Sequence, residues 1–230
     1  MAERSVVVTG GTGGLGGAVV ASFVEAGWRV VVPQRAARPG SEPAADGVVP
    51  LVADLTDPAG AARVVEAAVG DPAAPLRAVV NLVGGYASGG LVHETPVEEF
   101  ERMLTVNLRP TYLVTQAALP HLVAAGGGAV VCVSARAALT PFAGAAGYVT
   151  AKAAVLAFAN AVAVEYRSRN VRCNTVLPSV IDTPANRAAQ PDADHSRWVT
   201  PAEIAPVIRF LASTDSAPTT GASVPVYGRA

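Results

Sequence analysis

Tyr148 and Lys152 are the residues of this chain whose types and spacing point most directly to chemistry. They stand four positions apart at the start of an apolar helical pattern, so both side chains lie on one helical face, close enough to interact. A tyrosine titrates at about pH 10 and is therefore a poor acid at neutral pH. Because a neighbouring positive charge stabilises the phenolate, Lys152 is expected to lower the pKa of Tyr148. The pair predicts an acid-base group, although the same spacing also arises by chance.

A glycine-rich turn near the start of the chain predicts a nucleotide cofactor. Gly11, Gly13 and Gly16 match the spacing G-x-G-x-x-G, and the same turn also fits TG-x-x-x-G-x-G. Glycines at these positions let backbone N–H groups approach a pyrophosphate at the N-terminus of the helix that follows. The residues of this turn that are expected to contact the cofactor are Gly10, Thr12, Gly14, Leu15 and Gly16.

The end of the second expected strand indicates which nicotinamide cofactor binds. An acidic residue there binds the ribose 2′-hydroxyl of NAD, whereas a basic residue accommodates the 2′-phosphate of NADP. This chain has Gln34 and Arg35 at that place, with Arg38 shortly beyond and no carboxylate. Gln34 can hydrogen-bond either form, and the arginines either meet a phosphate or merely solvate a loop. We therefore expect NADP (NADPH) to be favoured over NAD (NADH).

Short β-branched runs alternate with longer helical patterns along the chain, which predicts an α/β fold. The expected strands are Ser5–Thr9, Trp28–Val32, Val48–Ala53, Ala78–Val83, Ala129–Ser134, Arg172–Leu177 and Ser223–Tyr227. The expected helices are Leu15–Ala26, Pro58–Val69, Pro96–Leu104, Leu108–Ala124, Gly147–Ser168 and Pro201–Ser213. Most strands are continuously apolar, as in a parallel sheet that is covered on both faces. We expect a single Rossmann-type domain over residues 1–230, with about seven strands in a doubly wound sheet and helices on both faces.

Two local patterns refine this prediction. Thr95 with Glu98, and Thr200 with Glu203, each have the spacing of a capping box at a helix start. The segment Asp182–Val199 has no clear periodicity and is long enough to form a lid.

Composition excludes several classes of function. The formal charge is −1 without a basic block, which argues against a nucleic-acid binder, and 51% hydrophobic residues argue against disorder. No run looks apolar enough to span a bilayer, and the N-terminus does not resemble a signal peptide. Cys132 and Cys173 are expected to be buried and reduced, and no cluster suggests a metal. We therefore expect a soluble cytoplasmic protein.

With these residues in place, the chain resembles the short-chain dehydrogenase/reductase family over nearly its whole length. The glycine turn and the pair Tyr148 and Lys152 are the most specific marks of the resemblance. It implies that Asn107 connects Lys152 to a proton relay through water. It also implies cofactor contacts by Asp54, Leu55, Asn81, Val83, Gly84, Tyr148, Lys152, Pro178 and Thr183. The implied reaction is hydride transfer from NAD(P)H to a C=O or C=N centre, with Tyr148 as proton donor. The implied assembly is a homodimer or homotetramer that pairs through residues 108–124 and 147–168.

The catalytic serine of the family is out of place in this chain. It usually precedes the tyrosine by 13 positions, where this chain has Ala135, and Ser134 is the nearby serine. Either the loop carries an extra residue and Ser134 polarises the substrate carbonyl, or that hydroxyl is absent. The dihydropteridine reductases of the family lack this serine, and the stretches 83–87, 135–139, 176–178, 182–187, 191–194 and 196–198 resemble theirs.

Three functions follow from these patterns. The first is a dihydropteridine-reductase-like enzyme acting on a pterin, carbonyl or imine, in which Tyr86 at the site mouth either stacks on a planar substrate or serves packing alone. The second is a general ketoreductase or alcohol dehydrogenase that uses Ser134. The third is a nucleotide-binding sensor without catalysis.

Overall fold

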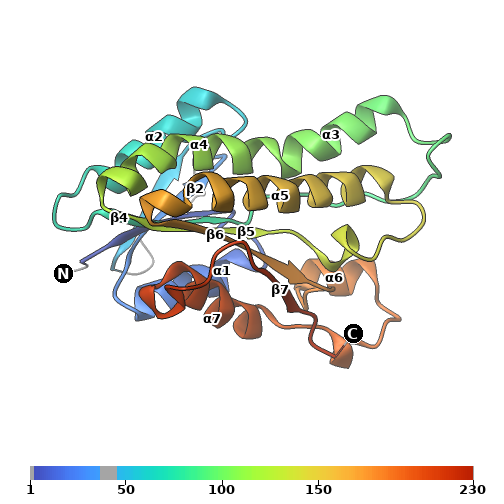
Figure 1. The fold of residues 1–230 in the computed structure, drawn as a ribbon. Helices are drawn as coiled ribbons and strands as arrows, with labels where there is room; N and C mark the ends of the chain where they lie inside the picture. The colour runs from blue at the N-terminus through green and yellow to red at the C-terminus, as the bar shows by residue number, and fades with distance from the viewer. Residues whose placement is uncertain (1–2, 37–45, 230) are drawn as a thin grey trace.

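A seven-stranded parallel sheet forms the centre of the molecule (Figure 1). The computed structural model describes residues 3–36 and 46–229, so Arg38 lies outside the described residues. The strands are β1 (Ser5–Thr9), β2 (Arg29–Gln34), β3 (Val48–Val52), β4 (Leu76–Asn81), β5 (Gly128–Val133), β6 (Val171–Pro178) and β7 (Ser223–Val226). Their order is β3-β2-β1-β4-β5-β6-β7, so the direction of winding reverses between β1 and β4. This is the Rossmann-type fold expected from the sequence, and the reversal is where such sheets bind ligands, beyond the carboxyl ends of the strands.

Helices cover both faces of this sheet (Figure 1). They are α1 (Gly16–Glu25), α2 (Pro58–Val69), α3 (Val97–Asn107), α4 (Arg109–Ala124), α5 (Ala146–Glu165), α6 (Pro184–Ala189) and α7 (Pro201–Ala212). One hydrophobic core lies under α2, α4 and α5, and a second lies under α1 and α7. Each strand therefore has to be apolar on both sides, which explains the continuous valine runs.

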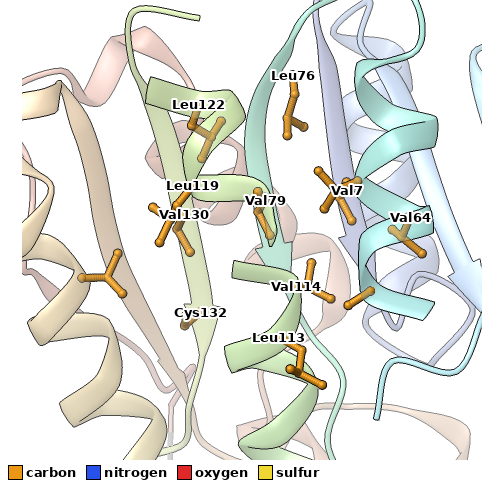
Figure 2. Close-up of a cluster of buried hydrophobic side chains, with 14 of the residues drawn as sticks. Val7, Val64, Leu76, Val79, Leu113, Val114, Leu119, Leu122, Val130 and Cys132 are labelled. Carbon is orange, nitrogen blue, oxygen red and sulfur yellow. The ribbon is translucent and has the colours of Figure 1, made fainter. Parts of the chain in front are cut away.

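Figure 2 shows the first core, in which Val7, Val79 and Val130 form a row across three adjacent strands. Leu119 and Leu122 of α4 pack in the same cluster. Each valine is fully buried, and such burial contributes about 1.5–3 kcal/mol per side chain. This packing holds β1, β4 and β5 in register, so the three loops that leave their carboxyl ends are held at one edge.

Several boundaries differ from the sequence prediction. Strand β4 ends at Asn81 rather than at Val83, which leaves Val83 and Gly84 in the loop beyond the sheet. The segment between β6 and α7 is ordered into α6 and the short turn η3 (His195–Arg197), with a parallel bridge between Ile181 and Val199. These elements are too short to give a detectable period in the sequence, which explains why the segment shows no clear periodicity although it is ordered.

The two predicted capping boxes have different outcomes. At α7, the Thr200 hydroxyl accepts a hydrogen bond from the Glu203 N–H while the Glu203 carboxylate accepts one from the Thr200 N–H, as predicted. At α3, the prediction is wrong because the Thr95 hydroxyl donates instead to the carbonyls of Gly90 and Leu91, at 3.2 and 3.0 Å. A hydroxyl that is engaged by the preceding loop cannot cap the helix that follows.

Helix α5 departs from the expectation on bilayer spans. With 20 residues and a mean hydropathy of 1.5, it is long and apolar enough to cross a membrane by length and composition alone. It lies on the sheet, however, with Val155, Ala159 and Val162 buried in the first core. Core helices of soluble proteins pass the same test, so one such helix is weak evidence of a membrane span.

Candidate active site

The glycine turn is bonded to the end of β4, so the predicted cofactor site and the loop after β4 are built together. The buried Thr9 hydroxyl accepts hydrogen bonds from the N–H groups of Leu82 and Val83, at 3.0 and 3.4 Å. Gly10 follows with φ +69°, a left-handed conformation that favours glycine, and its carbonyl accepts the Gly13 N–H at 2.9 Å. The turn is thereby closed directly at the reversal in strand order.

Two glycines of the turn sit where no side chain fits. A Cβ at Gly16 would lie 2.1 Å from the Gly10 carbonyl oxygen, so the start of α1 can approach the turn only as glycine. A Cβ at Gly14 would lie 2.7 Å from Cγ2 of Thr183, which is the N-cap of α6. The structure therefore brings the glycine turn into contact with the segment after β6, so one cofactor could contact both. A backbone without side chains next to a helix N-terminus fits the phosphates of a dinucleotide.

Some of the residues predicted to bind the adenosine part of the cofactor lie at the surface, and one does not. Gln34 ends β2 and is half-buried, and Arg35 next to it is exposed. Hydrogen bonds from the backbone and side chain of Thr56 lower the pKa of Asp54, and the Arg35 charge lowers it further, so a cationic and an anionic side chain lie near each other here. Leu55 is only 7% exposed and packs in the first core, so its side chain is turned away from a cofactor surface.

Gly60 is a residue of this end that the sequence analysis missed. A Cβ there would lie 1.9 Å from the Asp54 carbonyl oxygen, so α2 can cross behind Asp54 only because position 60 is glycine. The available signal was a glycine inside a helical pattern a few positions after Asp54, which costs helix stability and calls for a packing reason.

Tyr148 and Lys152 lie on the first two turns of α5, and the structure defines their electrostatics. Lys152 is buried, its Nζ donates a hydrogen bond to the Val133 carbonyl at 3.2 Å, and Nζ lies 6.0 Å from the centroid of the Tyr148 ring. Burial raises the pKa of Tyr148 to about 12 and lowers that of Lys152 to about 8. The expected lowering of the tyrosine pKa is wrong for this arrangement, because burial disfavours the phenolate while the ammonium is bonded to a carbonyl.

Asn107, the last residue of α3, is fully buried beside Lys152. Its Nδ2 donates to the carbonyls of Gly85 and Met103 at 3.0 and 2.9 Å, and its Oδ1 accepts the Gly85 N–H at 3.2 Å. A Cβ at Gly84 would lie 2.6 Å from this Oδ1 and 3.1 Å from the Lys152 Nζ. The asparagine, the lysine and the loop after β4 therefore meet at Gly84, where the sequence predicted a relay and a cofactor contact.

Ser134 does not present its hydroxyl to a substrate. It is 3% exposed, and its Oγ donates a hydrogen bond of 2.7 Å to the backbone carbonyl of Lys152. The alternative in which Ser134 polarises a carbonyl is contradicted by this geometry. Because successive residues of an extended chain point in opposite directions, the next residue, Ala135, takes the other side and brings no hydroxyl there.

Asn81 was predicted to contact the cofactor, but its side chain is directed into the protein interior. It is 2% exposed, and its Nδ2 contacts the Thr115 hydroxyl at 3.0 Å and the Cys132 sulfur at 3.8 Å. The side chain thus joins β4 to α4 and β5 under the sheet instead of lining the edge. Cys132 and Cys173 are both free and buried, as expected from the sequence.

Tyr86 lies next to Tyr148 on the solvent-exposed side of the group formed by Tyr148, Lys152 and Asn107. Its ring is 61% exposed and packs edge-on against Tyr148, with centroids 5.0 Å apart and an interplanar angle of 80°. Its hydroxyl donates to the Ser88 hydroxyl at 2.7 Å. The ring is therefore held next to the proposed acid while most of its surface stays free for a ligand.

Residues 4–194 match the family model described as short chain dehydrogenase. The chain belongs to this family. It is 33% identical to 2-(R)-hydroxypropyl-CoM dehydrogenase of Xanthobacter autotrophicus, over 98% of each chain. It is 32% identical to the 3-oxoacyl-[acyl-carrier-protein] reductase MabA of Mycobacterium tuberculosis, over 98% of this chain and 92% of that one.

Solved structures of the family superpose closely on this short-chain dehydrogenase. A short-chain dehydrogenase/reductase from Mycobacterium ulcerans gives a TM-score of 0.90 at 27% identity, covering 100% of this chain and 90% of that one. ElxO with NADP bound gives 0.89 at 25% identity, over 98% of each chain. The family, the fold and an NAD(P)-dependent oxidoreductase are thus established. The relatives named above are dehydrogenases and reductases of other substrates and lend no support to the dihydropteridine reductase subgroup.

Proposed function

We propose that this short-chain dehydrogenase transfers hydride between NADP(H) and a C=O or C=N centre, with Tyr148 as the group that gives or takes the proton. The observation that carries the proposal is that Lys152 and Asn107 meet at Gly84, at the edge where the glycine turn lies, while Tyr148 stands four residues before Lys152 on α5, with its ring centroid 6.0 Å from Nζ of that lysine. The bound nicotinamide supplies the hydride, and the chain supplies the proton and the positions of both reactants.

The proton is held on Tyr148 because burial raises its pKa to about 12. Lys152, with a pKa lowered to about 8 by burial, is protonated at neutral pH and can stabilise the phenolate that forms as the proton leaves. The Asn107 amide keeps the loop at Gly85 closed over Lys152. We propose that a water between these groups returns the proton to Tyr148.

The missing serine hydroxyl favours an acceptor that is already activated. With Ser134 bonded into α5 and Ala135 in its place, the chain lacks the usual hydrogen bond to the substrate oxygen. An iminium or a quinonoid pterin needs less polarisation than a simple ketone, and the exposed Tyr86 ring next to Tyr148 offers a surface for a planar substrate. Turnover of a quinonoid dihydropterin, compared with that of a panel of activated ketones, tests this preference.

Turnover by Tyr148→Phe is the decisive measurement. This variant keeps the ring that packs on Tyr86 and removes only the hydroxyl, so NADPH binding is expected to persist while turnover falls by about 100-fold or more. Tyr86→Phe is the matched control, because it removes the other hydroxyl of the ring pair and is expected to keep turnover. Full activity of Tyr148→Phe with every acceptor would exclude Tyr148 as the acid.

The cofactor preference has a separate test at the end of β2. NADPH is expected to bind more tightly than NADH, because Arg35 can meet a 2′-phosphate and the residues at this strand end are not acidic. Arg35→Gln should weaken NADPH binding and leave NADH binding unchanged. Equal loss of both would assign Arg35 to the fold rather than to cofactor choice.

We further propose a cytoplasmic homodimer or homotetramer that pairs through α4 and α5. Tyr112 on α4 and Val164 on α5 are 45% and 68% exposed, which leaves apolar surface on the outer side of both helices. Ala157 and Ala161 are also exposed, and side chains this small allow a partner helix to approach closely. Val164→Asp should shift the mass measured by sedimentation towards the monomer.

A further inference from the structure

Arg136 is a half-buried cation at the carboxyl edge of the sheet, outside the group formed by Tyr148, Lys152 and Asn107. It begins the short turn η1 (Arg136–Ala138), directly after Ala135. Its Cζ lies 5.2 Å from the centroid of the Tyr227 ring, just past the end of β7. Tyr227 is in turn anchored by a hydrogen bond of 2.7 Å from the Ser179 hydroxyl to its carbonyl. The guanidinium and its aromatic platform thus span the end of β6, from β5 to β7.

No anionic partner for Arg136 is found in the described part of the chain. The ion pairs of that part that include an arginine involve Arg29 and Arg187, and the Arg136 guanidinium donates no hydrogen bond to a described residue. Arg187 lies on α6, which follows the carboxyl end of β6. Its guanidinium is already held by two hydrogen bonds to the Asp182 carboxylate. A guanidinium stacked on an aromatic face keeps its five in-plane N–H donors available, in a fork that matches a planar oxyanion.

We propose that Arg136 recognises an oxyanion group on the substrate, so that the substrate class is a carbonyl or imine compound carrying a carboxylate or a similar anion. This inference rests on the proposed function, because it places the reacting centre at Tyr148. Turn η1 packs against α5, the helix of Tyr148. The turn also begins directly after Ala135, where the family has its serine, so an ionic contact at position 136 would orient a substrate that the missing hydroxyl cannot hold.

The test compares keto acids with their methyl esters, over a series that varies the spacing between the carbonyl and the carboxylate. Wild-type protein is expected to prefer one acid over its ester through a lower KM. In Arg136→Gln, the KM for that acid should rise about 10- to 100-fold with kcat little changed, because a charge-assisted contact is lost. The KM for the ester should not move. Arg136→Lys should recover part of the effect, since it keeps the charge but not the planar fork.

Arg187→Gln is the matched control, because that arginine lies at the same edge but is already paired with Asp182. It is expected to leave the ratio of acid to ester unchanged. Should Arg136→Gln raise the KM of acid and ester alike, or should the wild type show no preference for any acid, the assignment is overturned and Arg136 serves packing against Tyr227.

A binding measurement separates this inference from the proposed reaction. Carboxylates without a carbonyl group, each compared with its amide, can be titrated calorimetrically into the NADPH complex of wild type and of Arg136→Gln. Tighter binding of a carboxylate that disappears in the variant supports the anion site even if no substrate turns over. Equal binding of carboxylate and amide would overturn it, whether or not Tyr148-dependent turnover is found.

Discussion

Gly84→Ala is the substitution that most directly tests how the candidate site is built. The added Cβ would lie 2.6 Å from Oδ1 of Asn107 and 3.1 Å from Nζ of Lys152, and real Cβ atoms essentially never approach closer than 3.0 Å. Gly84 has no left-handed backbone, so the substitution tests crowding alone and not conformational strain. To admit one methyl group, the Asn107 side chain or the loop has to move, and the lysine has to give way by a few tenths of an ångström.

The magnitude follows from what holds Asn107. Its amide makes three hydrogen bonds, to the Gly85 N–H, the Gly85 carbonyl and the Met103 carbonyl, and the residue is fully buried. Displacing it leaves at least one buried polar group unpaired, which costs about 1–3 kcal/mol. The Lys152 ammonium ends a flexible side chain and can shift at lower cost, but only by leaving its contact with Val133. We therefore expect the free energy of unfolding to fall by about 1–3 kcal/mol. Turnover should also fall, because the displaced side chains are those of the candidate active site.

The assay is urea unfolding, combined with turnover at saturating NADPH. Gly85→Ala is the matched control, because its Cβ would meet only the Val106 side chain, with Cγ2 nearest at 3.2 Å, and this side-chain atom can yield. Replacing glycine by alanine also stabilises by about 0.4–1 kcal/mol through the unfolded chain, and this term is common to both variants. If Gly84→Ala unfolds at the same urea concentration as Gly85→Ala and keeps full turnover, Asn107 and Lys152 do not crowd Gly84, and the proposed meeting of the three is refuted.

Three other predictions concern charge, contact and capping. Burial lowers the pKa of Lys152 from 10.5 to about 8, so the unfolded chain binds more protons than the folded chain between these pH values. The free energy of unfolding should therefore rise with pH across this window, by up to about 3 kcal/mol. Lys152→Met should flatten that rise in unfolding curves measured from pH 7 to 10.5. The Cβ of Gly14→Ala would meet Cγ2 of Thr183 at 2.7 Å, so this variant should weaken NADPH binding about tenfold. Adding Thr183→Ser deletes that methyl group and keeps the N-cap oxygen, and the double variant should recover part of the lost NADPH affinity in the same titration. Thr200→Ala should lower the urea midpoint by the equivalent of about 0.5–2 kcal/mol through loss of the α7 cap, whereas an unchanged midpoint, or an equal loss in Thr200→Ser, would show that the hydroxyl does not cap the helix.

Local sequence patterns predicted much of the architecture, because their causes lie within a few residues. Continuous valine runs such as Val6–Val8 indicate strands buried on both faces, and the glycine turn indicates where the first helix begins. The spacing of Thr200 and Glu203 predicted a cap that forms entirely within one turn of α7. Where a neighbouring loop competes for the same hydroxyl, as it does at Thr95, the local pattern was not enough.

By itself, the sequence determined the parallel α/β sheet, the glycine turn and the placement of Tyr148 and Lys152 on one helix, since spacing along the chain decides all three. The tertiary structure alone decided which way Ser134 and Asn81 point, why position 84 is glycine, and that burial raises the pKa of Tyr148 rather than lowering it. Each of these depends on atoms from elements far apart in the sequence, through hydrogen bonds, close contacts and lost hydration. Such interactions exist only once α3, α5 and the end of β4 have packed together.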